Sequence, residues 1–396
     1  MPLAPADGGV NAALVTERGA RPATAGPASR PPAVRRLPWP RALLLLPAAA
    51  ALLLGLDAAM MLLGLPAPLT LPRLGDVHGV LLVLGFAGTL VALERAVALG
   101  SRWGYLAPAG LGAGGLALVV VPSPAVAGAL LTAGAAALVA VYVPLWARQP
   151  AAAVVVQALG AVLAVGAALL WWGGVPVPHL LPWLTGFLVL TIAGERVELA
   201  RVAVLDPRAD PIVVGTAGLL AAGVLVGLLW PVAGAAGTGA ALLATTAWLA
   251  RYDVARRTVR STGLPRFTGW ALLAGYGWLA VAGGIWLLGG PVTAGPGYDA
   301  VVHAVFLGFV ISIIIAHAPV ILPAVLRRPL PYRPAMYAPL VLLHISLALR
   351  IAVGDLRDVG SAWQLGGLLN VSAVLLFVAV AAWSAATADR RPRRSS

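Results

Sequence analysis

Twelve apolar stretches follow one another along this 396-residue chain, and short polar or Pro- and Gly-containing breaks separate them. A helix that crosses a bilayer needs roughly 20 apolar residues, because the hydrocarbon core is about 30 Å thick. The stretches lie near residues 41–64, 77–100, 104–121, 124–147, 151–173, 180–204, 212–231, 233–250, 267–289, 300–323, 334–353 and 360–385. This pattern predicts an all-α fold, a polytopic bundle of about twelve transmembrane helices in a lipid bilayer.

The composition agrees with a membrane protein and excludes other classes. Hydrophobic residues make up 60% of the chain and charged residues 10%, whereas soluble domains carry about 25% charged residues. The mean hydropathy is +0.93. These values exclude a soluble enzyme, a disordered protein and a nucleic-acid-binding domain. All 27 basic residues are Arg, so a Schiff-base Lys and a P-loop Lys are excluded as well.

The placement of Arg predicts the orientation, because cytoplasmic loops carry an excess of basic residues. With the N-terminus inside, the inward loops and the tail hold Arg102, Arg148, Arg208, the run 251–266, Arg327, Arg328, Arg333 and the run 390–394. The outward loops hold Arg73 and Arg357. We therefore expect a disordered cytoplasmic tail over residues 1–40, a transmembrane domain over 41–386 and a basic cytoplasmic tail over 387–396. The net charge of +13 is interpreted as this topology signal and not as a site for a polyanion.

Cysteine is absent, which excludes disulfides, iron–sulfur clusters, thiolate metal sites and covalently attached haem. Metal chemistry would have to use His, Met, carboxylate or Tyr, and the chain has only five His and four Met. The stretches near 104–121, 124–147, 212–231 and 233–250 are rich in Gly and Ala, which predicts closely packed scaffold helices. Polar residues concentrate instead in the stretches near 77–100, 180–204, 300–323 and 334–353.

The histidines are the first candidate site residues. His303 and His317 are 14 residues apart, which places them on one helix face and about 21 Å apart at ~1.5 Å per residue. This spacing is typical of helices that hold two stacked b-type haems. His78 is expected at the depth of His303, His344 at mid-depth, and His179 at the outer interface. We predict cofactor binding by His78, His303, His317 and His344, with His78, His303 and His344 as metal ligands; the alternative is ordinary hydrogen bonding between helices.

Two of the predicted helices share a sequence pattern, in which an Asp is followed by a His and then by a Gly-Phe pair. The Asp and His are Asp76 and His78 in one helix, and Asp299 and His303 in the other. The spacing from His to Gly-Phe differs by two residues, so the similarity is partial. It suggests an old internal repeat.

Carboxylates and Arg cluster at the predicted inner helix ends. The group consists of Glu94, Arg95, Glu195, Arg196 and Glu198. One interpretation is ion pairing that fixes helix register, and the other is a proton-conducting network or Arg binding to haem propionates. Arg350 is expected at the depth of an outer haem's propionates.

At these residues the sequence resembles the NnrS family of polytopic membrane proteins that contain haem and copper. The matching stretches are Asp76–Gly85, the segment from His303 through Gly308-Phe309 to His317, and the later helix with His344 and Arg350. The family usually has a His-Thr-Gly stretch where this chain has His317-Ala318-Pro319. The resemblance implies a bacterial inner-membrane protein, His-ligated haem b, copper, a link to nitric oxide or nitrosative stress, and a distant likeness to the haem-copper oxidase main subunit. No His pair has three- or four-residue spacing, so a full haem-copper centre is not expected.

Three functions therefore remain open at this point. The first is a membrane protein that binds haem, and also copper, and meets nitric oxide or exchanges electrons with a redox partner. The second is a proton-coupled secondary transporter, because twelve spans with both termini inside is a common transporter plan. The third is a structural or assembly protein without a ligand.

Overall fold

The computed structural model describes residues 39–200 and 206–388. The chain divides into two units, residues 1–36 and residues 37–396, and all described residues belong to the second unit. Most of the predicted N-terminal tail, up to residue 38, and the C-terminal residues 389–396 lie outside the described residues.

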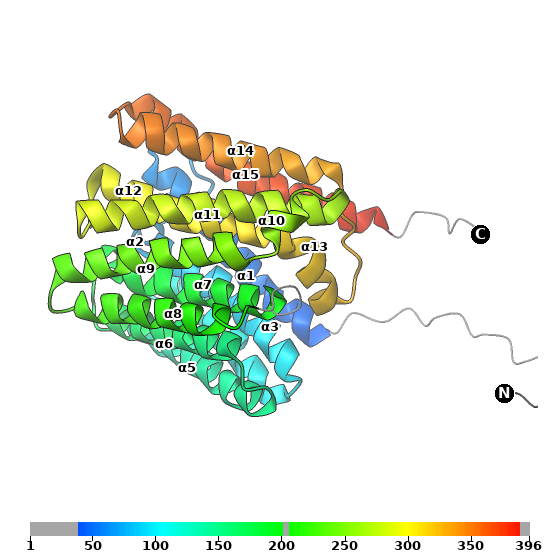
Figure 1. Ribbon diagram of the computed structural model, residues 1–396. Helices are drawn as coiled ribbons and strands as arrows, with labels where there is room; N and C mark the ends of the chain where they lie inside the picture. Colours follow the sequence, from blue (N-terminus) through cyan, green and yellow to red (C-terminus); the bar gives the residue numbers. More distant parts are fainter. Residues whose placement is uncertain (1–38, 201–205, 389–396) are drawn as a thin grey trace, which may run out of the picture. The chain divides into compact units, whose positions relative to one another are not determined.

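The described residues form helices joined by short loops (Figure 1). The α-helices are α1 (Trp39–Leu62), α2 (Arg73–Val80), α3 (Thr89–Leu99), α4 (Leu106–Val120), α5 (Pro124–Arg148), α6 (Ala152–Trp172), α7 (Val177–Ala200), α8 (Ala209–Val226), α9 (Pro231–Tyr252), α10 (Ala255–Thr258), α11 (Gly263–Gly289), α12 (Gly295–His303), α13 (Ser312–Leu326), α14 (Tyr337–Ala348) and α15 (Gly360–Ala386). Three π-helical segments are η1 (Leu81–Gly88), η3 (Ala304–Ile311) and η5 (Leu349–Asp355). Two short 3-10 helices are η2 (Arg102–Tyr105) and η4 (Pro334–Met336).

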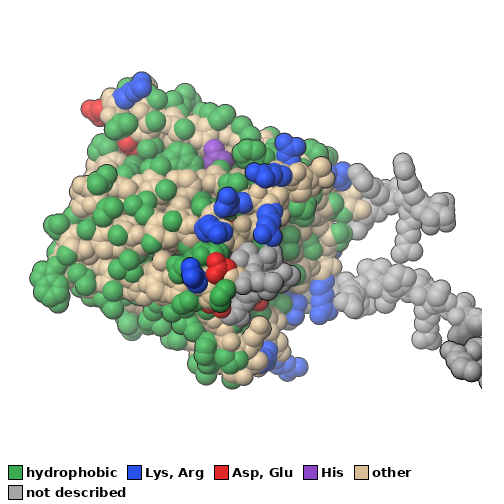
Figure 2. All heavy atoms as spheres, viewed as in Figure 1, with side chains coloured by type: hydrophobic (Ala, Val, Ile, Leu, Met, Phe, Trp, Pro, Cys, Tyr) green, Lys and Arg blue, Asp and Glu red, His purple; other side chains and the backbone are tan. Residues whose placement is uncertain are grey.

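Twelve helices of the described part are long and apolar enough to cross a bilayer, which confirms the predicted number. We number these spans 1 to 12 in chain order. Span 2 is the series α2–η1–α3, span 6 is α7, span 10 is α12–η3–α13 and span 11 is η4–α14–η5. Large apolar side chains cover the flank of the bundle (Figure 2), and Leu288, for example, is 88% exposed. Such a surface suits lipid and not water.

The two ends of the bundle differ in charge. Basic side chains gather toward the end at the right of Figure 2. We call it the Arg-rich end; its helix ends and loops carry Arg102, Arg148, Arg208, Arg251, Arg256, Arg260, Arg327 and Arg333. The connections at the opposite end hold Arg73 and Arg357.

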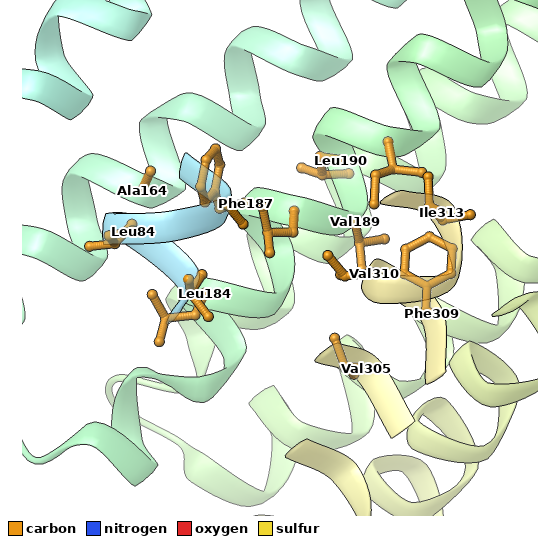
Figure 3. Close-up of a cluster of buried hydrophobic side chains, with 14 of the residues drawn as sticks. Leu84, Ala164, Leu184, Phe187, Val189, Leu190, Val305, Phe309, Val310 and Ile313 are labelled. Atoms are coloured by element: carbon orange, nitrogen blue, oxygen red, sulfur yellow. The ribbon is translucent and has the colours of Figure 1, made fainter. Parts of the chain in front are cut away.

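Spans 2, 6 and 10 form the centre of the bundle. In the most apolar window of each span, 67%, 78% and 56% of the residues are buried, against 33–50% in the other described spans. Figure 3 shows α7 between the other two, with Phe187 beside η1 and Val189 facing Val310 of η3. These three spans carry most of the predicted site residues, so the candidate chemistry lies at the core and not on the lipid face.

Spans 2 and 10 carry a π-helical segment at the same place. Each segment contains a Leu-Gly-Phe triplet, with its glycine at Gly85 or Gly308. A π register moves the backbone hydrogen bond from the fourth to the fifth following residue. The hydroxyls of Thr89 and Ser312, four residues on, donate to these two glycine carbonyls at 2.6 and 2.7 Å. The partial similarity seen in the sequence therefore extends to the backbone.

Glycines let the scaffold helices touch through their backbones. A Cβ built on Gly134 of α5 would lie 2.5 Å from the amide nitrogen of Leu111 in α4. A Cβ on Gly223 of α8 would lie 2.6 Å from the amide nitrogen of Thr238 in α9. Real Cβ atoms do not approach backbone so closely, so these sites require glycine. The close packing predicted for the Gly- and Ala-rich helices is confirmed.

We expect Gly134→Ala to lower the thermal unfolding midpoint of the detergent-solubilised protein. The new methyl group would push α4 and α5 apart, and overpacking of this kind costs about 1–3 kcal/mol. Gly284→Ala in α11 is the matched control, because its Cβ would meet nothing within 4 Å. Tryptophan fluorescence during heating measures both. Equal midpoints for the two variants would contradict the close packing of α4 on α5.

Candidate functional site

A cavity lies between α1, span 2, α7, span 10, η5 and α15, and its interior measures about 100 Å³. This volume is below the roughly 300–1,000 Å³ typical of small-molecule and cofactor sites, so a large ligand would require side chains of the wall to move. Its wall is mostly Leu, Val, Ile, Phe and Ala. The polar residues in the wall are His78, Tyr298, His303, Arg350 and Asn370. The cavity thus combines an apolar body with a few polar groups from four spans.

His78 and His303 reach this cavity from two different spans. His78 Nδ1–H donates to the carbonyl of Gly55 at 3.0 Å, and His303 Nδ1–H donates to the carbonyl of Asp299 at 2.8 Å. A carbonyl oxygen can only accept, so Nδ1 carries the proton in both rings and Nε2 keeps its lone pair. Neither Nε2 has a hydrogen-bond partner among the described residues. Both rings line the same cavity.

Asp299 links His303 to Arg350. Its carboxylate accepts two hydrogen bonds from Arg350, at 2.8 Å from Nε and 2.6 Å from Nη2, and it lies 3.3 Å from His303 Nδ1. The Arg350 guanidinium also lies 5.0 Å from the centre of the Trp363 ring. A Cβ on Gly367 would come within 2.8 Å of Arg350 Nη1, so this glycine makes room for the head group. Arg350 is therefore fixed, with a positive charge in the cavity wall.

His317 lies apart from this cavity, at the Arg-rich end of span 10. Its Nδ1–H donates to the carbonyl of Ile313 at 2.9 Å, and its Nε2 accepts from Arg196 Nη1 at 2.9 Å. Arg196 in turn donates to both oxygens of Asp253, which also accepts from the hydroxyl of Tyr276 at 2.8 Å. Both nitrogens of His317 are thus engaged, and the ring belongs to a buried polar network.

His344 is also held by other side chains. Trp278 Nε1–H donates to its Nδ1 at 2.9 Å, which leaves the ring proton on Nε2, 3.4 Å from the hydroxyl oxygen of Ser312. Trp278 packs against Gly308, where a Cβ would lie 2.4 Å from the indole. His344 does not line the cavity, and His179 is exposed at the start of α7. Of the five residues predicted to bind a cofactor, the structure brings three to this cavity, His78, His303 and Arg350.

A cluster of several metal ligands does not occur in the described part of the chain. No group of three or more His, Asp or Glu side chains there is arranged to hold a metal ion. The predicted metal set of His78, His303 and His344 is therefore not assembled around one point.

A second polar group occupies the Arg-rich end of the core. Arg95 donates to Glu94 at 2.5 Å and to Gln157 Oε1 at 3.2 Å. The carboxylates of Glu195 and Glu198 lie 3.8 and 3.9 Å from the guanidinium. The predicted network thus divides in two, because Arg196 belongs to the separate network of Asp253 and His317.

Spans 2 and 6 match at a constant offset, a signal that the sequence analysis missed. The offset is 101 residues (179 − 78), and it superposes His, Gly-Phe and Glu-Arg in the same order: His78 on His179, Gly85 on Gly186, Phe86 on Phe187, Glu94 on Glu195 and Arg95 on Arg196. A comparison of every polar span with every other would have found it. The match explains why the core holds two buried Arg at equivalent depths.

Span 10 follows the same pattern at an offset of 223 residues (299 − 76). This offset superposes Asp76 on Asp299 and Thr89 on Ser312, and it places His317 where span 2 has Glu94. The three most buried spans are therefore related elements, four spans apart in the chain. His303 falls two positions away from the place of His78, which is the spacing difference noted in the sequence.

A family model described as a domain of unknown function, DUF8744, matches residues 41–386. No curated protein and no solved structure matches the chain. The matched region contains all twelve spans and every candidate site residue. The chain therefore belongs to the DUF8744 family.

Proposed function

We propose that the protein binds one b-type haem in the cavity and that His78 and His303 would hold its iron. The observation that carries this proposal is the state of the two imidazoles. Each donates its Nδ1 proton to a carbonyl, and each has an unengaged Nε2 at one shared cavity. Ring nitrogens prepared in this way are typical metal ligands, because the second hydrogen bond fixes the tautomer and raises the basicity of the ligand.

The lining of the cavity supports the same ligand class. The apolar wall suits the porphyrin face, and Arg350, which is paired with Asp299, is the basic residue of the lining that would meet a propionate. Asp299 would hold His303 and Arg350 in place together. Haem with two imidazole ligands supplies one-electron transfer. The other two histidines predicted to bind a cofactor, His317 and His344, are engaged by other side chains, so the proposal is confined to one haem.

The resemblance to the NnrS family gives the proposal its setting, a bacterial inner membrane and a role in nitric oxide stress or electron transfer with a redox partner. Copper, which the resemblance also implies, would need ligands in addition to the two histidines of the cavity, and the described residues offer no such group. A second candidate, a proton-coupled transporter, is favoured by one observation, the three carboxylates around Arg95.

We expect the purified protein, expressed with ample haem, to show a Soret band that His78→Ala and His303→Ala each remove. Loss of an axial ligand should lower the haem affinity roughly tenfold or more, as loss of even a supporting residue does. His179→Ala is the matched control, because this exposed histidine stands where span 2 has His78. Added imidazole should restore the spectrum of His303→Ala. A protein without a Soret band, or one whose band survives both substitutions, would remove the proposal.

We expect Asp299→Asn to weaken haem binding about 10–100-fold and to move the haem midpoint potential to a more positive value. The substitution replaces a carboxylate beside His303 with a neutral amide, so the imidazole would donate less electron density to the iron. Asp76→Asn is the control, since Asp76 is exposed and occupies the equivalent position in span 2. Haem titration and redox potentiometry measure the two effects. Unchanged affinity and potential in Asp299→Asn would show that Asp299 does not support a ligand.

The proposed orientation, with the Arg-rich end in the cytoplasm, has its own test. The chain has no cysteine, so single cysteines report without background. We expect Leu356→Cys, at a position that is 81% exposed at the opposite end, to react with a membrane-impermeant maleimide in intact spheroplasts. Thr262→Cys, at the exposed start of α11, should react only after the membrane is permeabilised. The reverse pattern would invert the topology.

A further inference from the structure

The group around Arg95, which we call the Arg95 cluster, has more acid than base. It consists of Glu94, Arg95, Gln157, Glu195 and Glu198, together with the nearby Tyr142. Three carboxylates face one guanidinium, so the formal charge is −2 with every carboxylate ionised. The equivalent Arg196 is balanced instead, because its partners are one aspartate and the neutral acceptor His317.

The three carboxylates are not equivalent. Glu94 makes the shortest ion pair with Arg95, at 2.5 Å. The side chain of Glu198 is 60% exposed and is solvated at the bundle end. Glu195 is 15% exposed and lies 3.8 Å from the guanidinium, beyond hydrogen-bond distance. Among the described residues it therefore has only a loose ion pair and no hydrogen bond, and an ionised carboxylate that is mostly buried in this way is costly.

The cluster also contains buried polar atoms without partners. Arg95 Nε, Gln157 Nε2 and the Tyr142 hydroxyl are buried and make no hydrogen bond to the described residues. Gln157 is 1% and Tyr142 2% exposed, and the Gln157 head group lies in the cluster because Arg95 donates to its Oε1. Tyr142 lies within charge range of Arg95 and of all three carboxylates. Unpaired buried donors of this kind commonly mark the place of internal water.

We propose that the Arg95 cluster is a proton-binding site that takes up one proton from the solvent at the Arg-rich end and holds it on Glu195. The exposed Glu198 receives solvent protons, and internal water beside Gln157 and Tyr142 connects it to Glu195. In the step itself, an O–H bond of hydronium breaks, an O–H bond forms on a Glu195 carboxylate oxygen, and water remains. The proposal does not depend on haem.

Infrared spectroscopy of the full-length protein tests this site without a ligand. A protonated carboxyl gives a carbonyl-stretch band that is well separated from the bands of carboxylates and moves in heavy water. The chain has only four glutamates, and three of them belong to the cluster. Isotope labelling of glutamate at its side-chain carboxyl therefore reports almost entirely on this site.

We expect wild-type protein at neutral pH to show one protonated-carboxyl band that shifts with the glutamate label and is absent from Glu195→Gln. Glu17→Gln, at the one glutamate outside the described residues, should leave the band unchanged. Glu198→Gln should keep the band and slow its exchange in heavy water. A band that persists in Glu195→Gln, or the lack of any label-sensitive band in wild type, would overturn the proposal. The wild-type labelling result decides the matter even where Glu195→Gln does not fold, and either outcome leaves the haem proposal untouched.

Discussion

A polar group inside an apolar bundle has no water to bond with, so it must find its partner within the protein. This constraint orders the core of the molecule. Arg196, Asp253, Tyr276 and His317 satisfy one another completely. Each of the two cavity histidines uses one ring nitrogen in a hydrogen bond and leaves the other nitrogen without a partner among the described residues. In the Arg95 cluster, three buried atoms make no hydrogen bond to the described residues. The satisfied network holds helices together, whereas the cavity and the Arg95 cluster each have polar atoms that a ligand or water could still bind.

The three central spans show how one helix pattern supports different chemistry. Spans 2, 6 and 10 share a Gly-Phe pair at equivalent positions, and their burial exceeds that of the other described spans. The residues that differ at equivalent positions set the local function. Where spans 2 and 6 have Glu94 and Glu195, span 10 has His317. Arg95 therefore meets carboxylates at these positions, whereas Arg196 meets an imidazole in addition to its partner Asp253. His179 matches His78 in sequence, yet it stands at the exposed start of α7 and lines no cavity.

The sequence allowed the fold to be predicted closely but the site only in part. Apolar length decides where a helix can span a bilayer, and this property is local, so all twelve spans were found. The predicted single face for His303 and His317 assumed a uniform 100° per residue, but η3 lies between them. A π segment changes the rotation of everything that follows it, and nothing in the local sequence of η3 signals it. The engagement of His317 by Arg196 depends on contacts 121 residues apart, which helical periodicity does not report.

The two proposed sites lie on the same helix series, and their separation limits how strongly they act on each other. His78 and Glu94 are 16 residues apart in span 2 (94 − 78), or about 24 Å at ~1.5 Å per residue. At an effective dielectric constant of about 20, two unit charges at that distance interact by about 0.7 kcal/mol. A negative charge gained beside His78 would therefore favour a proton on the Arg95 cluster by a factor of about three. With a haem on His78, as proposed, this coupling would bias proton uptake toward the reduced state without making it obligatory. Tight coupling would require a chain of polar groups through the apolar middle of the core, where the described residues of α7 place Leu184, Phe187 and Leu190.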